Sequence, residues 1–165
     1  MSVRAVLGQQ ITVKAASTLA ARLVAVYGTQ VQTGIEGLTH SFPAPAAILA
    51  LGENISEHLG KLGIISARAN TIYQLARVLA DEKNDFGFCG NPEEEMQKLQ
   101  AIRGIGSWTA QYIAMRAMGW PDAFLPTDAG IKKALPDHTP KELQALSEAW
   151  RPWRSYATVN LWNTL

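Results

Sequence analysis

Apolar residues recur at helical spacing through most of the chain. Two such stretches open the sequence, at residues 3–7 and 19–26. A β-branched interruption separates them, and Thr12 within it has the side chain of a helix N-cap. The pattern therefore predicts two helices joined near Gln9 and Gln10.

Local capping signals mark further helix starts. Asn91 precedes Pro92 and a run of three glutamates, which places a cap, a proline and acidic side chains where a helix begins. Thr139 and Glu142 have the spacing of a capping box. Ser66 is predicted to cap a long amphipathic helix. Three more helices are expected from the same spacing, at 43–51, 55–62 and 129–135.

No segment alternates apolar and polar residues in the manner of a strand. The glycine-containing stretch 29–40 is predicted to be a loop. We find no internal repeat and no low-complexity linker. The fold class is therefore predicted as all-α, with eight to ten short helices.

Composition is that of a folded globular protein. The chain has 165 residues, 47% of them hydrophobic and 18% charged, which is enough for one core or two small lobes. No apolar run reaches the roughly 20 residues of a membrane span. Cys89 is the single cysteine, which excludes an internal disulfide and an iron–sulfur cluster. With no export signal at the start, we expect a cytoplasmic protein.

Charge is distributed unevenly although the net charge is only +1. Residues 1–35 carry a balance of +3, residues 36–95 one of −5, and residues 96–165 one of +3. If the two basic ends fold together, they would present one basic face to a polyanion. The alternative is a chance distribution of charge along the chain, which would imply no such partner.

A four-residue turn, Arg103 to Gly106, separates the helix begun at Pro92 from a second helix that starts at once. Two glycines around Ile105 are expected to reverse the chain with positive φ, while Ile105 fills the gap between the helices. The amides of Gly104, Gly106 and Ser107 are left at a helix N-terminus, where a phosphate can approach. The alternative is a helical hairpin that only needs a tight turn.

With these residues the sequence resembles the helix-hairpin-helix/Gly-Pro-Asp superfamily of DNA base-excision glycosylases, and within it the DNA-3-methyladenine glycosylase II branch. The resemblance covers nearly the whole chain. It rests on residues 3–10, the hairpin 92–118, Phe124-Leu125-Pro126-Thr127-Asp128, and Trp150-Arg151-Pro152-Trp153-Arg154-Ser155-Tyr156-Ala157. It implies a glycosylase domain over 1–165, with a cleft between two helical lobes, roughly 30–118 and 1–29 plus 119–165.

Asp128 matches the family's catalytic carboxylate, which stabilises positive charge on the sugar as the glycosidic bond breaks. On local sequence alone, an ordinary N-cap is the favoured interpretation of Asp128, and only the family resemblance reverses it. Bifunctional relatives carry a lysine where this chain has Trp108, so the resemblance implies a monofunctional enzyme that uses water and leaves an abasic site.

Aromatic residues match the family's base pocket, namely Trp108, Tyr112 and Trp162, with Gln9 beside them. An electron-rich pocket suits an alkylated purine, whose ring carries positive charge. The alternative for each aromatic is core packing, which is our interpretation of Trp150 and Trp153.

The resemblance also implies the residues that contact DNA. These are Gln10, Arg103, Gly104, Ile105, Gly106, Ser107 and Thr109. Gln10 stands where a close family member has a leucine that fills the gap left by the flipped base. No side-chain metal site is expected, although the family's hairpin can bind a monovalent cation through backbone carbonyls near Gln100, Ile102 and Gly104.

The sequence thus predicts a monomeric glycosylase that excises alkylated purines such as 3-methyladenine from damaged double-stranded DNA, nucleoid-associated when bound and without a membrane partner. Members of the family often carry an N-terminal β-domain that this sequence lacks, so we interpret it as a fragment or a compact variant. Two alternatives remain open: a helix-hairpin-helix DNA-binding module with reduced catalysis, and a helical interaction domain without a nucleic acid partner.

Overall fold

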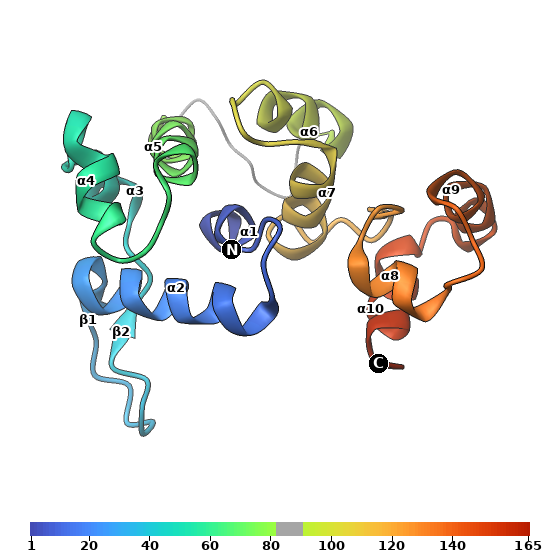
Figure 1. Ribbon diagram of the computed structural model, residues 1–165, viewed down its shortest axis with the longest axis horizontal. Coiled ribbons are helices and arrows are strands. Elements are labelled where there is room, and N and C mark those ends of the chain that lie inside the picture. The colour runs from blue at the N-terminus through green and yellow to red at the C-terminus, as the bar shows by residue number, and fades with distance from the viewer. Residues whose placement is uncertain (82–90) are drawn as a thin grey trace. The chain divides into compact units, whose positions relative to one another are not determined.

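The computed structural model describes residues 1–81 and 91–165, so Cys89 lies outside the described residues. Its helices form two compact units (Figure 1). Of the described residues, the first unit contains 2–81 and Ile102–Gly104, and the second contains Met1, 91–101 and 105–165. None of the helices described is both long and apolar enough to cross a membrane.

The first unit is built around α5. Its elements are α1 (Ser2–Leu7), α2 (Val13–Tyr27), β1 (Thr29–Gln30), β2 (His40–Ser41), α3 (Pro45–Leu49), η1 (Gly52–Asn54), α4 (Ile55–Gly60) and α5 (Ser66–Ala80). Helices α1, α3 and α4 all pack on α5, and α1 also packs on α2 (Figure 1). Leu7, Leu23, Leu59, Ile72 and Leu75 are fully buried in this unit. Burial of their side chains supplies the main driving force for its folding.

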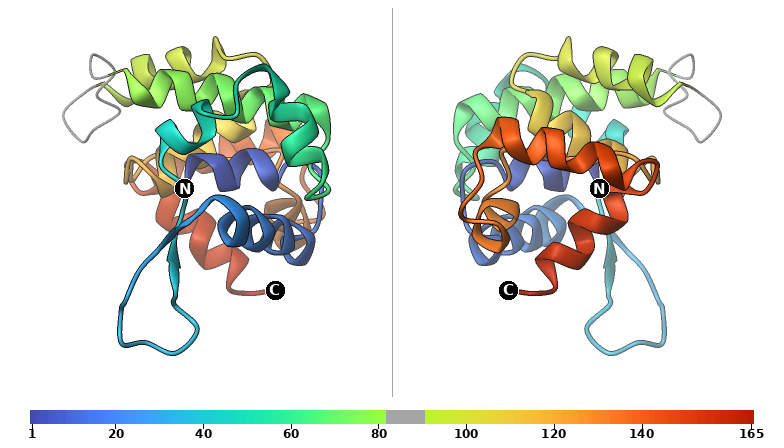
Figure 2. Two further views of the ribbon diagram at one scale, coloured as in Figure 1. Left: turned by 90° about the vertical axis from the view of Figure 1, so that its left-hand side faces the viewer. Right: turned by 90° about the vertical axis from the view of Figure 1, so that its right-hand side faces the viewer.

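A small antiparallel sheet corrects the expectation that residues 29–40 are only a loop. Thr29 pairs with Ser41, and Gln30 pairs with His40. The loop between the strands projects away from the helices of its unit (Figure 2). Strands of two residues are too short to show an alternating pattern, so the sequence carried no signal for them.

The second unit contains the hairpin helices and the C-terminal part of the chain. Its elements are α6 (Pro92–Gln100), α7 (Ser107–Arg116), α8 (Ala129–Ala134), α9 (Pro140–Ser147), η2 (Glu148–Trp150) and α10 (Arg154–Trp162). Phe124, Ile131 and Leu143 form a buried cluster, against which Trp150 and Trp162 pack. Trp150 therefore has the packing role expected of it. The expectation is wrong for Trp153, which is 58% exposed and packs edge-on against exposed Tyr156.

Most of the helix caps predicted from the sequence are present in the structure. The side chains of Thr12 and Asn91 each accept a hydrogen bond from a backbone amide of the first turn. Thr139 and Glu142 form the complete capping box. The prediction for Ser66 is wrong, because Ile65 occupies the cap position and Ser66 is the first helical residue.

The two units divide the chain differently from the expected lobes of 30–118 and 1–29 plus 119–165. Residues 2–29 belong with 30–81, because α1 and α2 pack against each other and α1 packs on α5. Helices α6 and α7 belong with the C-terminal helices.

A buried ion pair fixes the loop between α7 and α8 to the start of α10. Arg154 Nε and Nη2 donate to the two oxygens of Asp122 at 2.7 and 2.9 Å, and both side chains are at least 90% buried. Arg151 Nη1 reaches the same carboxylate at 2.5 Å. Ser155 adds bonds from its backbone amide to the Pro121 carbonyl and from its hydroxyl to the Trp120 carbonyl. The loop that leads to Asp128 is thus held at several points by α10.

We expect stability to depend on this ion pair and to fall in acid. Burial raises the pKa of Asp122, but hydrogen bonds and charge from Arg154, with charge from Arg151, outweigh it, so the pKa lies below its ordinary value. A lowered folded pKa stabilises the protein above the unfolded pKa of about 4, and this stabilisation is lost as the pH falls through the folded value. Asp122→Asn should therefore cost about 3 kcal/mol at neutral pH by leaving Arg154 buried without its counter-charge.

Thermal unfolding between pH 2 and 7 would measure this effect. Glu57→Gln is the matched control, because it removes an acid from the exposed Lys61–Glu57 pair and should leave the melting temperature unchanged. Equal melting temperatures for Asp122→Asn and Glu57→Gln would contradict the prediction.

Candidate active site

Asp128 is buried at the start of α8 and is held by four N–H donors. Its Oδ1 accepts from the backbone amides of Gly130 and Ile131 at 2.9 and 3.1 Å, and from Trp162 Nε1 at 2.8 Å. Its Oδ2 accepts from Trp108 Nε1 at 3.0 Å. No Lys or Arg in the described part of its unit forms an ion pair with it. The donors replace the water that burial removes, and Oδ2 keeps more free accepting capacity than Oδ1.

The predicted aromatic residues come together around this carboxylate. Trp108 and Tyr112, one helical turn apart on α7, stack with ring centroids 5.2 Å apart and planes 19° apart. Tyr112 also faces Trp162 of α10, at 6.3 Å and with a 39° tilt. The three side chains are only partly buried, so their ring faces remain in part accessible. The structure therefore brings Asp128, Trp108, Tyr112 and Trp162 into one cluster, as the resemblance implies.

Gly130 makes room for Trp162 beside Asp128. A Cβ at this position would lie 2.6 Å from Trp162 Cδ1 and 2.8 Å from its Nε1, which is closer than real Cβ contacts. Only glycine allows the indole to reach Oδ1 while α8 begins at Asp128. The sequence pattern did not point to Gly130, although a glycine in the first turn of a helix is a weak signal of close packing.

The hairpin turn needs only one of its two glycines for positive φ. Gly104 has φ +94°, and a Cβ there would lie 2.1 Å from Thr71 Oγ1. Gly106 is instead extended, with φ −90° and ψ 179°, and serves as the N-cap of α7. The expectation of positive φ at both glycines is therefore wrong for Gly106, because a cap residue takes extended backbone angles.

The start of α7 is open to an approaching ligand. Gly106 and Ser107 are exposed, and a Cβ added at Gly106 would have no heavy atom within 4 Å. Their amides donate to no described residue of their unit. Ile105 and Thr109 are buried, at 4% and 3% exposure. Their side chains pack inside the protein, so a contact with DNA from either residue would come from its backbone.

The loop between α1 and α2, residues 8–12, contains the two glutamines singled out in the sequence. Gln9 Nε2 donates to the carbonyl of Gly104 at 2.8 Å, within the first unit. Gln10 is exposed and has φ +54°, the one non-glycine residue with positive φ among those described. Such a conformation is uncommon outside glycine and strained for a glutamine. A base-pocket role for Gln9 remains a prediction, and the contact with Gly104 gives its side-chain amide a structural partner.

The carbonyl of Gly104 is also one of the three expected cation ligands. The bond from Gln9 uses one of its lone pairs and leaves the other available. The cation therefore remains a prediction. In the described part of the chain, no group of three His, Cys, Asp or Glu side chains is placed to hold a metal ion.

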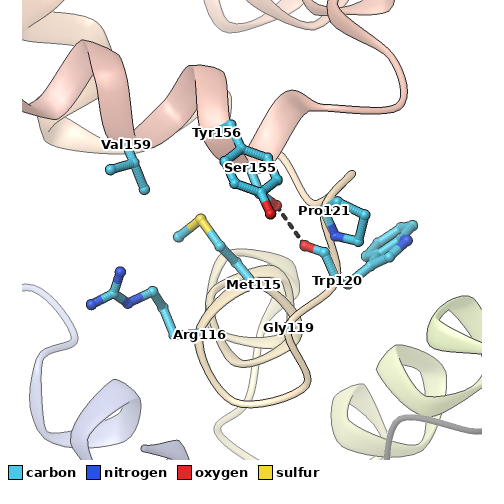
Figure 3. Close-up of a pocket in the computed structure, with 8 residues that line it drawn as sticks. All are labelled: Met115, Arg116, Gly119, Trp120, Pro121, Ser155, Tyr156 and Val159. Carbon is cyan, nitrogen blue, oxygen red and sulfur yellow. Dashed lines mark hydrogen bonds between the residues drawn. The ribbon is translucent and has the colours of Figure 1, made fainter.

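A separate pocket of about 200 Å³ lies between the C-terminal end of α7 and α10 (Figure 3). Met115, Arg116, Tyr156 and Val159 contribute to its wall, and the Ser155 hydroxyl there donates to the Trp120 carbonyl. None of the residues around Asp128 lines it. Its one lining cation, Arg116, is exposed at the end of α7.

Comparison with known proteins shows that the chain is similar to proteins named as DNA repair enzymes. The chain is 42% identical over 168 residues to the probable bifunctional transcriptional activator/DNA repair enzyme AlkA of Mycobacterium tuberculosis, covering 99% of this chain and 33% of that protein. It is 36% identical to DNA-3-methyladenine glycosylase 2 of Escherichia coli, covering 98% of this chain and 56% of that protein. The chain thus spans about a third and just over half of these relatives.

A solved structure and a family model extend the comparison. The 3-methyladenine DNA glycosylase Mag1 of Schizosaccharomyces pombe, solved with abasic DNA, superposes with a TM-score of 0.79 at 22% identity, covering 99% of this chain and 78% of that one. At this identity the likeness establishes the fold. The HhH-GPD superfamily base excision DNA repair protein model matches residues 3–153. The chain therefore belongs to the HhH-GPD superfamily of base excision DNA repair proteins.

Proposed function

We propose that this protein is a monofunctional DNA glycosylase that removes alkylated purines by hydrolysis. The observation that carries the proposal is the buried Asp128 carboxylate, held by N–H donors and without a cationic partner in the described part of its unit, beside three aromatic side chains. The names of the relatives, which are repair enzymes and 3-methyladenine glycosylases, support the same function.

In the proposed reaction the bond between C1′ and the purine nitrogen breaks, and its electron pair leaves with the base. The sugar becomes cationic at C1′, and the fixed negative charge of Asp128 stabilises that cation. Water then attacks C1′ and loses a proton, for which Oδ2 of Asp128 is the acceptor with more free capacity. The products are the free base and an abasic deoxyribose. No side chain becomes covalently attached.

The aromatic side chains account for the proposed substrate class. A purine alkylated at a ring nitrogen carries positive charge, which is attracted to the faces of Trp and Tyr rings. The same charge makes the base a good leaving group. Trp108, Tyr112 and Trp162 therefore favour a cationic base over an ordinary neutral one.

Release of 3-methyladenine from alkylated duplex DNA tests the proposal directly. We expect free base and one heat-labile abasic site for each base released. A helix-hairpin-helix binding module would bind the same duplex and release nothing, and a helical interaction domain would not bind it. Each of the two alternatives thus gives its own result in the assay.

The product should be an abasic site on an intact strand. Trp108 has no amine, so borohydride is expected to trap no covalent adduct between protein and DNA. Lys132 and Lys133 are the lysines that follow Asp128 most closely, and both are exposed on α8. An adduct that is lost in Lys132→Ala or Lys133→Ala would contradict the monofunctional mechanism.

The start of α7 is proposed to hold a DNA phosphate through the amides of Gly106 and Ser107. Gly106→Val should fold normally, because its backbone is extended and the added side chain meets open space. It should still weaken duplex binding about tenfold, because the side chain would cover the amides. The loss should be equal for damaged and undamaged DNA, since phosphate contacts do not read sequence. Fluorescence anisotropy with both duplexes would measure this, and a loss confined to damaged DNA would argue against it.

A further inference from the structure

The first two turns of α5 contact two loops that lie far apart in sequence. Arg68 donates through Nη2 to the backbone carbonyl of Gln9, in the loop between α1 and α2. Thr71, three residues later, shares its one hydroxyl proton between the carbonyl of Arg103 at 3.1 Å and that of Ala67 in its own helix at 3.0 Å. Residues spaced by three lie on one face of a helix, so the same face of α5 holds both loops.

Gln9 joins the two loops directly. Its side-chain amide donates to the carbonyl of Gly104, while its own carbonyl accepts from Arg68. The contacts form a closed circuit that runs from α5 to Gln9, on to Gly104, and back through Arg103 to Thr71. Gly104 fits tightly into this circuit, because its Cα lies against Thr71 with no room for a Cβ. We define these residues, Gln9, Arg68, Thr71, Arg103 and Gly104, as the brace.

The brace holds the residue that directly precedes the strained residue of the α1–α2 loop. Gln10 follows Gln9 directly and is exposed with φ +54°. Strain of this kind persists only where neighbouring contacts hold the backbone in place. The bond from Arg68 fixes the peptide that leads into Gln10, and the bond to Gly104 fixes the preceding side chain.

We propose that Arg68 is a positioning residue that holds Gln10 ready to enter the DNA duplex, with Gln9 acting as the bridge to the hairpin turn. This proposal rests on the proposed glycosylase function. Residues 103 and 104 form the first half of the hairpin turn, directly before the amides of Gly106 and Ser107 that are proposed to hold phosphate. The brace thereby links phosphate binding at the start of α7 to the position of Gln10, the side chain proposed to fill the gap left by a flipped base.

Arg68→Met removes the donor and keeps most of the aliphatic side chain. We expect single-turnover release of 3-methyladenine at saturating protein to fall about tenfold, the size of a lost charge-assisted hydrogen bond, while affinity for undamaged duplex stays within about twofold. A duplex with 2-aminopurine beside a tetrahydrofuran abasic site should give a smaller fluorescence rise with this variant. Arg68→Lys, which restores a cationic donor, should recover part of both signals.

Arg22→Met is the matched control. Arg22 donates through Nη1 to the carbonyl of Leu62 at 3.1 Å, so it makes the same kind of bond in the same unit but away from the brace. Amide hydrogen exchange of residues 8–12 without DNA should accelerate in Arg68→Met and remain as in the parent in Arg22→Met.

Three results would overturn the inference. One is equal behaviour of Arg68→Met and Arg22→Met in exchange and fluorescence. Another is loss of affinity for undamaged duplex in Arg68→Met, which would make Arg68 a phosphate contact. The third is full base release by Arg68→Met. Failure of the unsubstituted protein to release any base would instead refute the proposed function, and hydrogen exchange would still decide whether Arg68 holds the loop.

Discussion

Replacement of Asp128 by asparagine is expected to slow base release about 100-fold or more while leaving the fold intact. Asparagine has the same size, and its oxygen can still accept the amides of Gly130 and Ile131 and the indole of Trp162. Its Nδ2 group would then face Trp108 Nε1, which now donates to Oδ2. Two N–H donors cannot bond to each other, and the negative charge that stabilises the cationic sugar is lost.

Single-turnover base release and duplex affinity together measure this effect. Affinity for undamaged duplex should not change, since Asp128 does not belong to the hairpin turn. Asp137→Asn is the control, because it removes an exposed acid soon after α8. Base release by Asp128→Asn at the parent rate would mean that Asp128 is only a helix cap, and the proposed mechanism would be wrong.

Gly130→Ala is expected to slow base release about tenfold or more because it displaces the indole of Trp162. The added Cβ would lie within 3 Å of the indole, so Trp162 must move away from Asp128 and lose its hydrogen bond. Alanine favours a helix over glycine by about 1 kcal/mol, so helix propensity alone predicts no loss. Gly60→Ala is the control, because a Cβ at that helical glycine meets no atom within 4 Å.

A double-mutant cycle separates this mechanism from general damage to the fold. In a Trp162→Phe background the bond to Asp128 is already gone, so Gly130→Ala should add little further loss. Fully additive losses would show that Gly130 acts by some route other than Trp162.

Local chemistry explains what the sequence could predict. The caps at Thr12, Asn91 and Thr139 involve residues at most three positions apart, so they can be read directly from the chain. Asp128 caps α8 as its local sequence indicates. Its second set of bonds, from Trp108 and Trp162, spans 20 and 34 residues, and only the family resemblance pointed to it.

What the sequence missed depends on contacts between distant segments. Trp150 in η2 packs on the core, whereas Trp153, just before α10, is exposed, and only the tertiary structure distinguishes the two. The bond between Gln9 and Gly104 joins residues 95 positions apart, and Arg68 reaches Gln9 across 59. Neither hydrogen bond corresponds to a residue spacing or a composition that can be recognised in a single sequence.

The two indole bonds to Asp128 have a consequence for magnetic resonance. The protein contains five tryptophans, and each indole N–H gives a separate proton signal in a region with few others. An indole N–H proton that is hydrogen-bonded to a carboxylate resonates downfield. The Nε1–H signals of Trp108 and Trp162 are therefore expected to be separate from those of the other three tryptophans. These two signals would report the entry of a ligand without any label placed in the site.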